Sequence, residues 1–90
     1  MYQIVYDKNL KDKDGKLKFS IPKEILANLI KKIEEVAKTG IVPPKDRLKG
    51  KLQGYFKKKV SKYRAICSIH KEKNLLLVHD LGIRDNFYDR

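Results

Sequence analysis

Residues 54–81, GYFKKKVSKYRAICSIHKEKNLLLVHDL, contain the pattern that decides the fold. Apolar and polar side chains alternate here with a period of two, which is typical of strands that bury one face. Turn-forming residues interrupt the pattern at Ser61-Lys62 and again in the segment 71–74. We therefore expect three consecutive antiparallel strands, at residues 55–60, 63–69 and 75–81.

The turn at Ser61-Lys62 determines which side chains share a face. A two-residue turn pairs Lys59 with Arg64, and directly opposed residues of an antiparallel pair point to the same side. If the loop of the next hairpin also has an even length, one face of the sheet is apolar. That face then carries Phe56, Val60, Tyr63, Ala65, Cys67, Ile69, Leu76 and Val78.

The opposite face carries three cations, Lys57, Lys59 and Arg64. Cations this close destabilise a sheet unless an anion lies between them, which favours a phosphate-binding site. Three long side chains that extend into water would explain the same pattern, so the cluster alone leaves both interpretations open. Lys58 falls on the apolar face by parity, and we expect it at a sheet edge with its stem buried and its amine reaching water.

The first half of the chain predicts one strand and one main helix. Residues 1–6 are rich in Tyr, Ile and Val and predict a strand. A helix is expected over residues 22–40, with Ser20 as a candidate cap. Residues 8–18 are ambiguous, because they could start a short helix or form a turn at Gly15 followed by an extended segment. The helix is indicated by apolar residues at helical spacing, namely Ile25, Leu26, Leu29, Ile30, Ile33, Val36 and Ala37.

Together these elements predict an α+β domain. We expect a small antiparallel β-sheet, made of an N-terminal strand plus a C-terminal three-stranded meander, with one or two helices packed on one face. Ninety residues enclose one core, so residues 1–90 form a single domain. The lone cysteine, Cys67, fits a reducing compartment. No segment has the length of a membrane span and the start lacks a signal sequence, so we expect a cytoplasmic protein with no membrane partner.

The positive charge is concentrated in one segment. The chain has 22 Lys and Arg against 11 Asp and Glu, a net charge of +11. Residues 45–73 hold 11 basic and 2 acidic residues, which leaves +9 in that segment. This distribution is typical of nucleic-acid ligands, although genome bias or a thermophilic surface also produces Lys-rich chains. No Cys/His cluster has metal-ligand spacing and no glycine-rich phosphate loop is present, so no metal or cofactor is expected.

Three motifs resemble those of a known family. They are Leu48-Lys49-Gly50, GYFKKKVSKYRAI at residues 54–66, and DLGIRDNFY at residues 80–88. In combination they resemble the RelE/ParE toxins of bacterial and archaeal toxin–antitoxin systems, and within these the RelE-like mRNA interferases. The resemblance implies the RelE-like microbial RNase fold, from which residues 8–18 depart because the family has a long first helix there.

The resemblance also implies a metal-independent endoribonuclease that cleaves mRNA in the ribosomal A site. The ribose 2′-oxygen would attack the adjacent phosphorus, which requires a base, cations for the phosphorane and an acid for the leaving oxygen. Tyr88 would be the base, and Arg84 would protonate or neutralise the leaving oxygen, with Lys59 as an alternative acid. The implied catalytic residues are Lys57, Lys59, Arg64, Arg84 and Tyr88.

The implied partners are a RelB-like antitoxin, with which the chain would oligomerise, and the mRNA and ribosomal RNA. The antitoxin would cover the cations or displace Tyr88. Two other functions remain open: a ParE-like inhibitor of DNA gyrase, and a small basic ribosome- or nucleic-acid-binding module. The residues expected to contact RNA or the ribosome are Lys45, Arg47, Lys49, Lys51 and Lys62.

Two histidines, His70 and His79, fall on the cationic face if the second hairpin loop has an even length. Paired histidines commonly catalyse RNA cleavage because they titrate near neutral pH. His70 lies at a hairpin tip, however, and His79 is at a position that the family does not use. We therefore do not expect a catalytic role for either.

Overall fold

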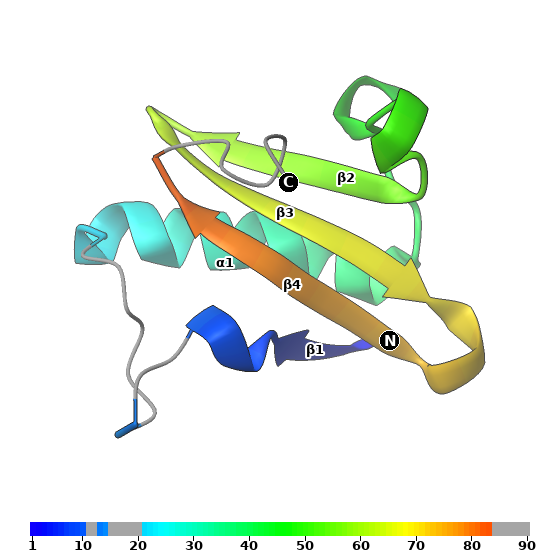
Figure 1. The fold of residues 1–90 in the computed structure, drawn as a ribbon, viewed down its shortest axis with the longest axis horizontal. Helices are drawn as coiled ribbons and strands as arrows, with labels where there is room; N and C mark the ends of the chain where they lie inside the picture. Colours follow the sequence, from blue (N-terminus) through cyan, green and yellow to red (C-terminus); the bar gives the residue numbers. More distant parts are fainter. Residues whose placement is uncertain (11–12, 15–20, 84–90) are drawn as a thin grey trace.

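Four strands among the described residues form one sheet in the order β1-β4-β3-β2. The computed structural model describes residues 1–10, 13–14 and 21–83. Its helix α1 covers one face of the sheet, and no helix of the described residues covers the other, which we call the open face (Figure 1). The main elements are β1 (Gln3–Tyr6), α1 (Lys23–Thr39), β2 (Tyr55–Val60), β3 (Tyr63–His70) and β4 (Leu75–Gly82). Short 3-10 turns lie at η1 (Lys8–Leu10), η2 (Pro44–Asp46), η3 (Gly50–Leu52) and η4 (Lys71–Lys73).

The predicted α+β class and the three-stranded meander are confirmed, and β2, β3 and β4 are consecutive antiparallel strands. The first strand differs in direction from the expected all-antiparallel sheet. β1 lies parallel to β4, with Gln3 opposite Leu75, so the sheet is mixed. A parallel pair requires a long crossover, and the chain between β1 and β4 provides it. The edge of β2 is partly occupied by a bridge between Arg47 and Phe56, which leaves the edge of β4 for β1.

The predicted main helix is confirmed. Pro22 precedes its first residue, and Gly40 ends it in the left-handed conformation with φ 72°. The Gly40 amide donates a hydrogen bond to the Val36 carbonyl oxygen at 2.7 Å, which closes the last turn. The candidate cap Ser20 lies outside the described residues. Among the described residues, no helix combines the length and the apolar character needed to cross a membrane.

The core lies between α1 and the apolar face of the sheet. Burial of this apolar surface is the main force that holds the helix on the sheet. The predicted sorting of side chains is confirmed, with Val60 and Ile69 only partly buried. The buried cluster consists of Leu10, Leu29, Ile33, Val36, Ala37, Phe56, Tyr63, Ala65, Cys67, Leu76, Val78 and Leu81.

The ambiguous segment 8–18 is described only in part. A 3-10 turn begins at Lys8, and it places Leu10 in the core with 3% of its surface exposed. Residues 13–14 form a turn, and Ile21 packs against the core. The predicted turn residue Gly15 and the extended segment after it lie outside the described residues.

Candidate nucleic-acid interface

The two-residue turn between β2 and β3 sets the register as predicted. Lys59 opposes Arg64. Lys57, which lies two residues before Lys59 on β2, opposes Ile66. Opposed residues of an antiparallel pair share a face, so the two lysines and the arginine lie together on the open face. The structure therefore brings together the three cations that the sequence placed there, with Lys59 exposed and Lys57 and Arg64 half-buried.

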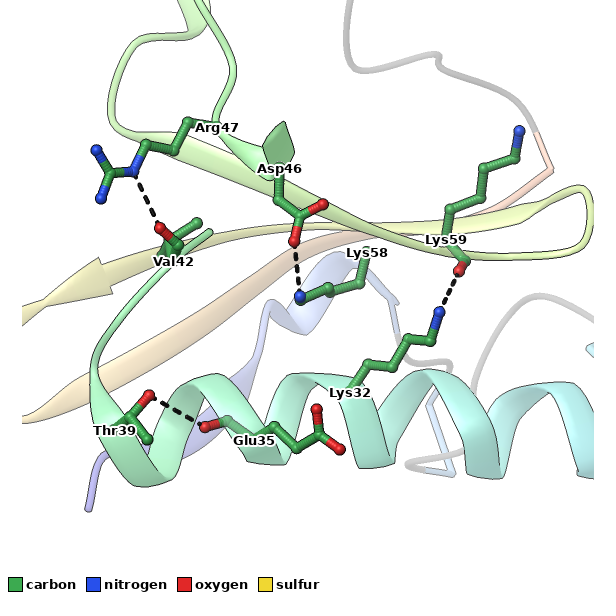
Figure 2. A network of polar contacts seen from close by, with 8 residues as sticks. All are labelled: Lys32, Glu35, Thr39, Val42, Asp46, Arg47, Lys58 and Lys59. Carbon is green, nitrogen blue, oxygen red and sulfur yellow. Dashed lines mark hydrogen bonds and ion pairs between the residues drawn. The ribbon is translucent and has the colours of Figure 1, made fainter. Parts of the chain in front are cut away.

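The strand that carries the lysines is fastened to α1 on its other side. Figure 2 shows the Lys59 side chain pointing away from α1. The Lys32 amine, which comes from α1, donates a hydrogen bond to the Lys59 carbonyl oxygen at 3.0 Å. The backbone at Lys59 is thus held by the helix, and its side chain extends on the opposite side, at the open face.

Lys58 lies on the edge strand β2, as predicted, but its amine does not extend into water. Its Nζ lies 2.7 Å from Oδ2 of Asp46 in η2, and the two side chains are 13% and 18% exposed (Figure 2). The expectation that the amine reaches water is wrong, because a nearby carboxylate compensates the charge in a partly desolvated place. Asp46 is one of only two acids in the basic segment 45–73. An isolated acid among so many basic residues is the sequence feature that could have predicted an ion pair.

A polar cluster occupies the open face at the other end of the same strands. The Ser68 hydroxyl oxygen lies 2.8 Å from Nε2 of His70 and 2.6 Å from Nε2 of His79. The Tyr55 ring meets the His79 ring edge to face, with 5.0 Å between centroids and 75° between planes. Tyr55 itself opposes Ser68 in the β2–β3 register. We call these four side chains the histidine cluster. Sequence parity placed both histidines on this face but did not reveal their link through Ser68.

A β-bulge in β4 occurs at His79 and sets the direction of the two residues that follow it, Asp80 and Leu81. Ile66 opposes Asp80, and His79 is the extra residue in β4 at this register shift. Without the bulge, Asp80 would oppose Ala65 and enter the core, whereas with it Leu81 takes that place. The sequence analysis missed this irregularity. A carboxylate at a position that strict alternation assigns to the core was the signal that could have found it.

The environment of His79 favours its neutral form. Partial burial lowers the pKa of the His79 imidazole, while Asp7 opposes the shift and His70 adds to it. Asp7 follows β1, the strand beside β4, and its amide donates to the Val78 carbonyl oxygen at 2.9 Å. A neutral imidazole retains one hydrogen-bond donor and one acceptor, which suits contact with an uncharged polar ligand.

The five basic residues expected to contact RNA do not form one patch. All five are exposed, but Lys62 lies in the turn between β2 and β3, away from the other four. Its amine is 5.9 Å from the centroid of the Tyr63 ring. The other four precede β2, in or next to η2 and η3, namely Lys45, Arg47, Lys49 and Lys51.

A cavity of about 980 Å³ lies where this segment meets the start of β2 and the end of β3. Arg47, Lys49 and Lys71 line it together with apolar residues such as Val42 and Ile69. The Arg47 Nε donates a hydrogen bond to the Val42 carbonyl oxygen at 3.1 Å, which fixes the arginine at the cavity (Figure 2). These three cations therefore lie near the start of β2, in addition to the three cations of the open face.

Two of the five expected catalytic residues, Arg84 and Tyr88, lie outside the described residues and stay predictions. Within the described part of the chain, no three His, Cys, Asp or Glu side chains gather closely enough to hold a metal ion. The described site thus consists of Lys57, Lys59 and Arg64 with the neighbouring histidine cluster.

Solved structures resemble this chain throughout its length. The isolated RelE toxin of Escherichia coli superposes with a TM-score of 0.74 at 22% identity, over 99% of this chain and 93% of that one. The toxin–antitoxin complex RelBE of the same organism gives a TM-score of 0.74 at 21% identity, over 94% and 99%. The RelBE2 complex of Mycobacterium tuberculosis gives 0.57 at 21% identity, over 92% and 98%.

This chain has the fold of the RelE toxins. The RelE-like fold agrees with the resemblance found in the sequence motifs and confirms the fold that they implied. No model of a known protein family matches the chain, and neither does any curated protein.

Proposed function

We propose that this chain is the toxin of a type II toxin–antitoxin system and acts as an endoribonuclease on messenger RNA in the ribosomal A site. One observation carries the proposal: Lys59 and Arg64 are directly opposed on the open face, with Lys57 beside them. Three cations on a β-sheet that has the RelE-like fold are suited to bind a phosphate and the extra negative charge of a phosphorane. Messenger RNA on ribosomes would place this activity in the cytoplasm.

The proposed reaction requires no metal ion. The ribose 2′-oxygen forms a bond to phosphorus, the bond from phosphorus to the 5′-oxygen breaks, and the cations stabilise the dianionic phosphorane between these events. Tyr88 accepts the proton of the 2′-hydroxyl, and Arg84, or alternatively Lys59, supplies or compensates the proton at the leaving oxygen. The products are a 2′,3′-cyclic phosphate and a 5′-hydroxyl.

The proposed protein partner is an acidic antitoxin of the RelB type. Two of the similar structures are complexes of E. coli RelE with its antitoxin RelB or with a RelB peptide. A chain with a net charge of +11 offers complementary charge to an acidic partner. The antitoxin would inactivate the toxin by covering Lys57, Lys59 and Arg64 or by displacing Tyr88.

A translation extract programmed with one defined message tests the proposal. Wild-type protein should cut the message during translation, and mapping of the new ends should show cyclic phosphates and 5′-hydroxyls in the presence of a metal chelator that spares the ribosome. Arg64→Ala should abolish cleavage. Lys31→Ala is the matched control, because Lys31 is exposed on α1, which covers the opposite face of the sheet.

Other outcomes would contradict the proposal in distinct ways. Uncut message together with inhibited DNA supercoiling by gyrase would identify a ParE-like toxin. Uncut message together with ribosome binding would identify a basic ribosome-associated module. Cleavage that survives in a folded Arg64→Ala protein would show that the open face is not the active site.

A further inference from the structure

The register of the sheet brings one carboxylate to the cations of the open face. Ile66 opposes Lys57 on β2 and Asp80 on β4, so the acid and the lysine point to the same side. Arg64 opposes Gly82, which lies two residues after Asp80 on β4. Arg64 and Asp80 are therefore diagonal neighbours on adjacent strands. Asp80 is the only acid within the four strands of the described residues, and the proposed cleavage assigns it no role.

The side chain of Arg64 is long enough to reach this carboxylate. Diagonal neighbours on antiparallel strands lie about 7–8 Å apart, within the span of a long side chain. Gly82, the residue opposite Arg64 on β4, has no side chain to separate the two groups. On the other side of Arg64 lies Lys59, whose like charge repels the guanidinium. The charges on either side of Arg64 thus favour an orientation toward β4 and Asp80.

The burial of Asp80 separates it from an ordinary surface acid. An acid that only improves solubility would be exposed, whereas Asp80 is 8% exposed. Its Oδ1 accepts a hydrogen bond from the Leu81 amide at 3.0 Å. A carboxylate this far removed from water is costly unless a positive charge also compensates it. By register, Arg64 is the nearest cation within the strands, and its Nε is buried as well.

The bulge in β4 is what places this carboxylate on the open face. A bulge breaks the local pairing of two strands, and bulges are frequent beside active sites, where they redirect side chains. Here the bulge directs Asp80 to the open face at the level of Lys57 and keeps Leu81 in the core, 2% exposed. Its outcome is one negative charge among three positive ones.

We propose that Asp80 is a positioning residue that orients the Arg64 guanidinium toward the phosphate. The inference rests on the proposed function, which supplies the phosphate. A guanidinium is planar and has five donors in a fixed fork, so a carboxylate at one edge leaves another edge for a phosphate oxygen. The orientation exists before RNA binds, and a donor that needs no reorganisation stabilises the phosphorane best.

Asp80→Asn tests this role with little change in shape. The asparagine oxygen can still accept the bond from the Leu81 amide, so the substitution removes mainly the charge. Asp7→Asn is the matched control: Asp7 Oδ1 accepts the Asn9 amide at 2.9 Å, and asparagine can keep that bond too. Asp7 follows β1, which lies on the side of β4 away from β3 and Arg64. Thermal unfolding verifies each fold, and Asp80→Ser, also uncharged and able to accept the bond, serves if Asp80→Asn does not fold.

The NMR signal of the Arg64 Nε–H group tests the contact without RNA or cleavage. Arg64→Lys removes this signal and thereby assigns it. The Nε atom is buried, so its hydrogen should exchange slowly with water in the wild type. Asp80→Asn should accelerate this exchange at least about tenfold, because the guanidinium is no longer held in one orientation. Asp7→Asn should leave it unchanged.

Cleavage of a defined message in a translation extract separates orientation from binding. Variation of the protein concentration gives the maximal cleavage rate and the half-saturating concentration. Asp80→Asn should lower the maximal rate at least about tenfold, because Arg64 is misplaced. It should also lower the half-saturating concentration about two- to fivefold, because a negative charge has left the cationic face. Structural damage would instead lower the rate and weaken the binding together.

The outcomes decide the inference separately from the proposed cleavage. Unchanged exchange of the Arg64 signal in folded Asp80→Asn would overturn it, and so would an unchanged maximal rate in a wild type that cuts the message. A rate loss with an equal loss of affinity, or the same effects in Asp7→Asn, would also overturn it. If the exchange accelerates in Asp80→Asn while the wild type cuts no message, the contact between Asp80 and Arg64 stands and the nuclease proposal fails.

Discussion

Lys58 and Asp46 form an ion pair, 2.7 Å from Nζ to Oδ2, on the side of edge strand β2 that faces α1. The pair connects η2 to β2. The lysines on either side of Lys58, Lys57 and Lys59, point to the opposite face of the sheet. A partly buried lysine without its carboxylate would keep the cost of desolvation and lose the compensation. The pair therefore positions η2 against β2, on the side of the sheet opposite the open face.

Loss of either partner of this ion pair should destabilise the folded protein. Asp46→Asn should lower the free energy of unfolding by about 1–3 kcal/mol, because it leaves an uncompensated charge in a place that is mostly desolvated. Lys58→Met keeps the stem but leaves the Asp46 carboxylate, which is 18% exposed, without its partner, so it should lower the free energy of unfolding by a similar amount. Urea denaturation measures both, with Glu72→Gln at an exposed position of η4 as the control. Equal losses for Asp46→Asn and Glu72→Gln would show that the ion pair adds nothing.

Repulsion between the opposed cations should lower the free energy of unfolding of the wild-type protein. Lys59→Gln should raise the free energy of unfolding at low ionic strength by a few tenths of a kcal/mol, because like charges that face each other across two strands repel. The gain should vanish at about 1 M salt, where the screening length falls to about 3 Å. Lys31→Gln is the matched control on α1, where Glu35 four residues later is an opposite charge, and it should not stabilise. A Lys59→Gln protein less stable than the wild type at low salt would contradict this reading.

The buried thiol should be inert in the folded protein. Burial raises the pKa of Cys67 to about 12, and the charge of Lys58 opposes this only in part. Because the folded value exceeds the unfolded value of 9.0, this contribution to stability is fully present below about pH 9 and is lost as pH rises from there toward 12. Alkylation by iodoacetamide at pH 8.5 should proceed only after unfolding, and Cys67→Ala should remove this part of the alkaline destabilisation. Fast alkylation of the native protein would show that the thiol is accessible.

Two glycines with similar backbone angles should differ in their tolerance of a side chain. Gly40 and Gly50 have φ of 72° and 66°, so alanine is strained at either position, by about 1 kcal/mol. A Cβ at Gly40 would also lie 2.8 Å from Cε2 of Tyr2, whereas a Cβ at Gly50 meets nothing within 4 Å. Gly40→Ala should therefore lower the melting temperature clearly more than Gly50→Ala. Comparable losses would mean that the Tyr2 ring moves aside without cost.

The local pattern of the sequence determined the strands, the main helix and the sorting of the cations. Period-two alternation and a two-residue turn are sufficient to place Lys57, Lys59 and Arg64 on one face, because the register of a short hairpin depends only on its own turn. The apolar residues at helical spacing and Gly40 likewise defined α1 from within the segment itself. The sequence motifs also pointed to the RelE-like fold, which the structure has.

Only the tertiary structure decided the features that depend on segments far apart in the chain. Which edge of the sheet β1 joins depends on the bridge between Arg47 and Phe56, which occupies the other edge. The ion pair of Lys58 depends on where the loop after α1 brings Asp46. The bulge at His79 depends on a balance between two strands, because one extra residue costs a local break in pairing but keeps Leu81 in the core and Asp80 out of it. Each of these features depends on the relative free energies of contacts between distant segments. A pattern within one segment carries no information about such contacts.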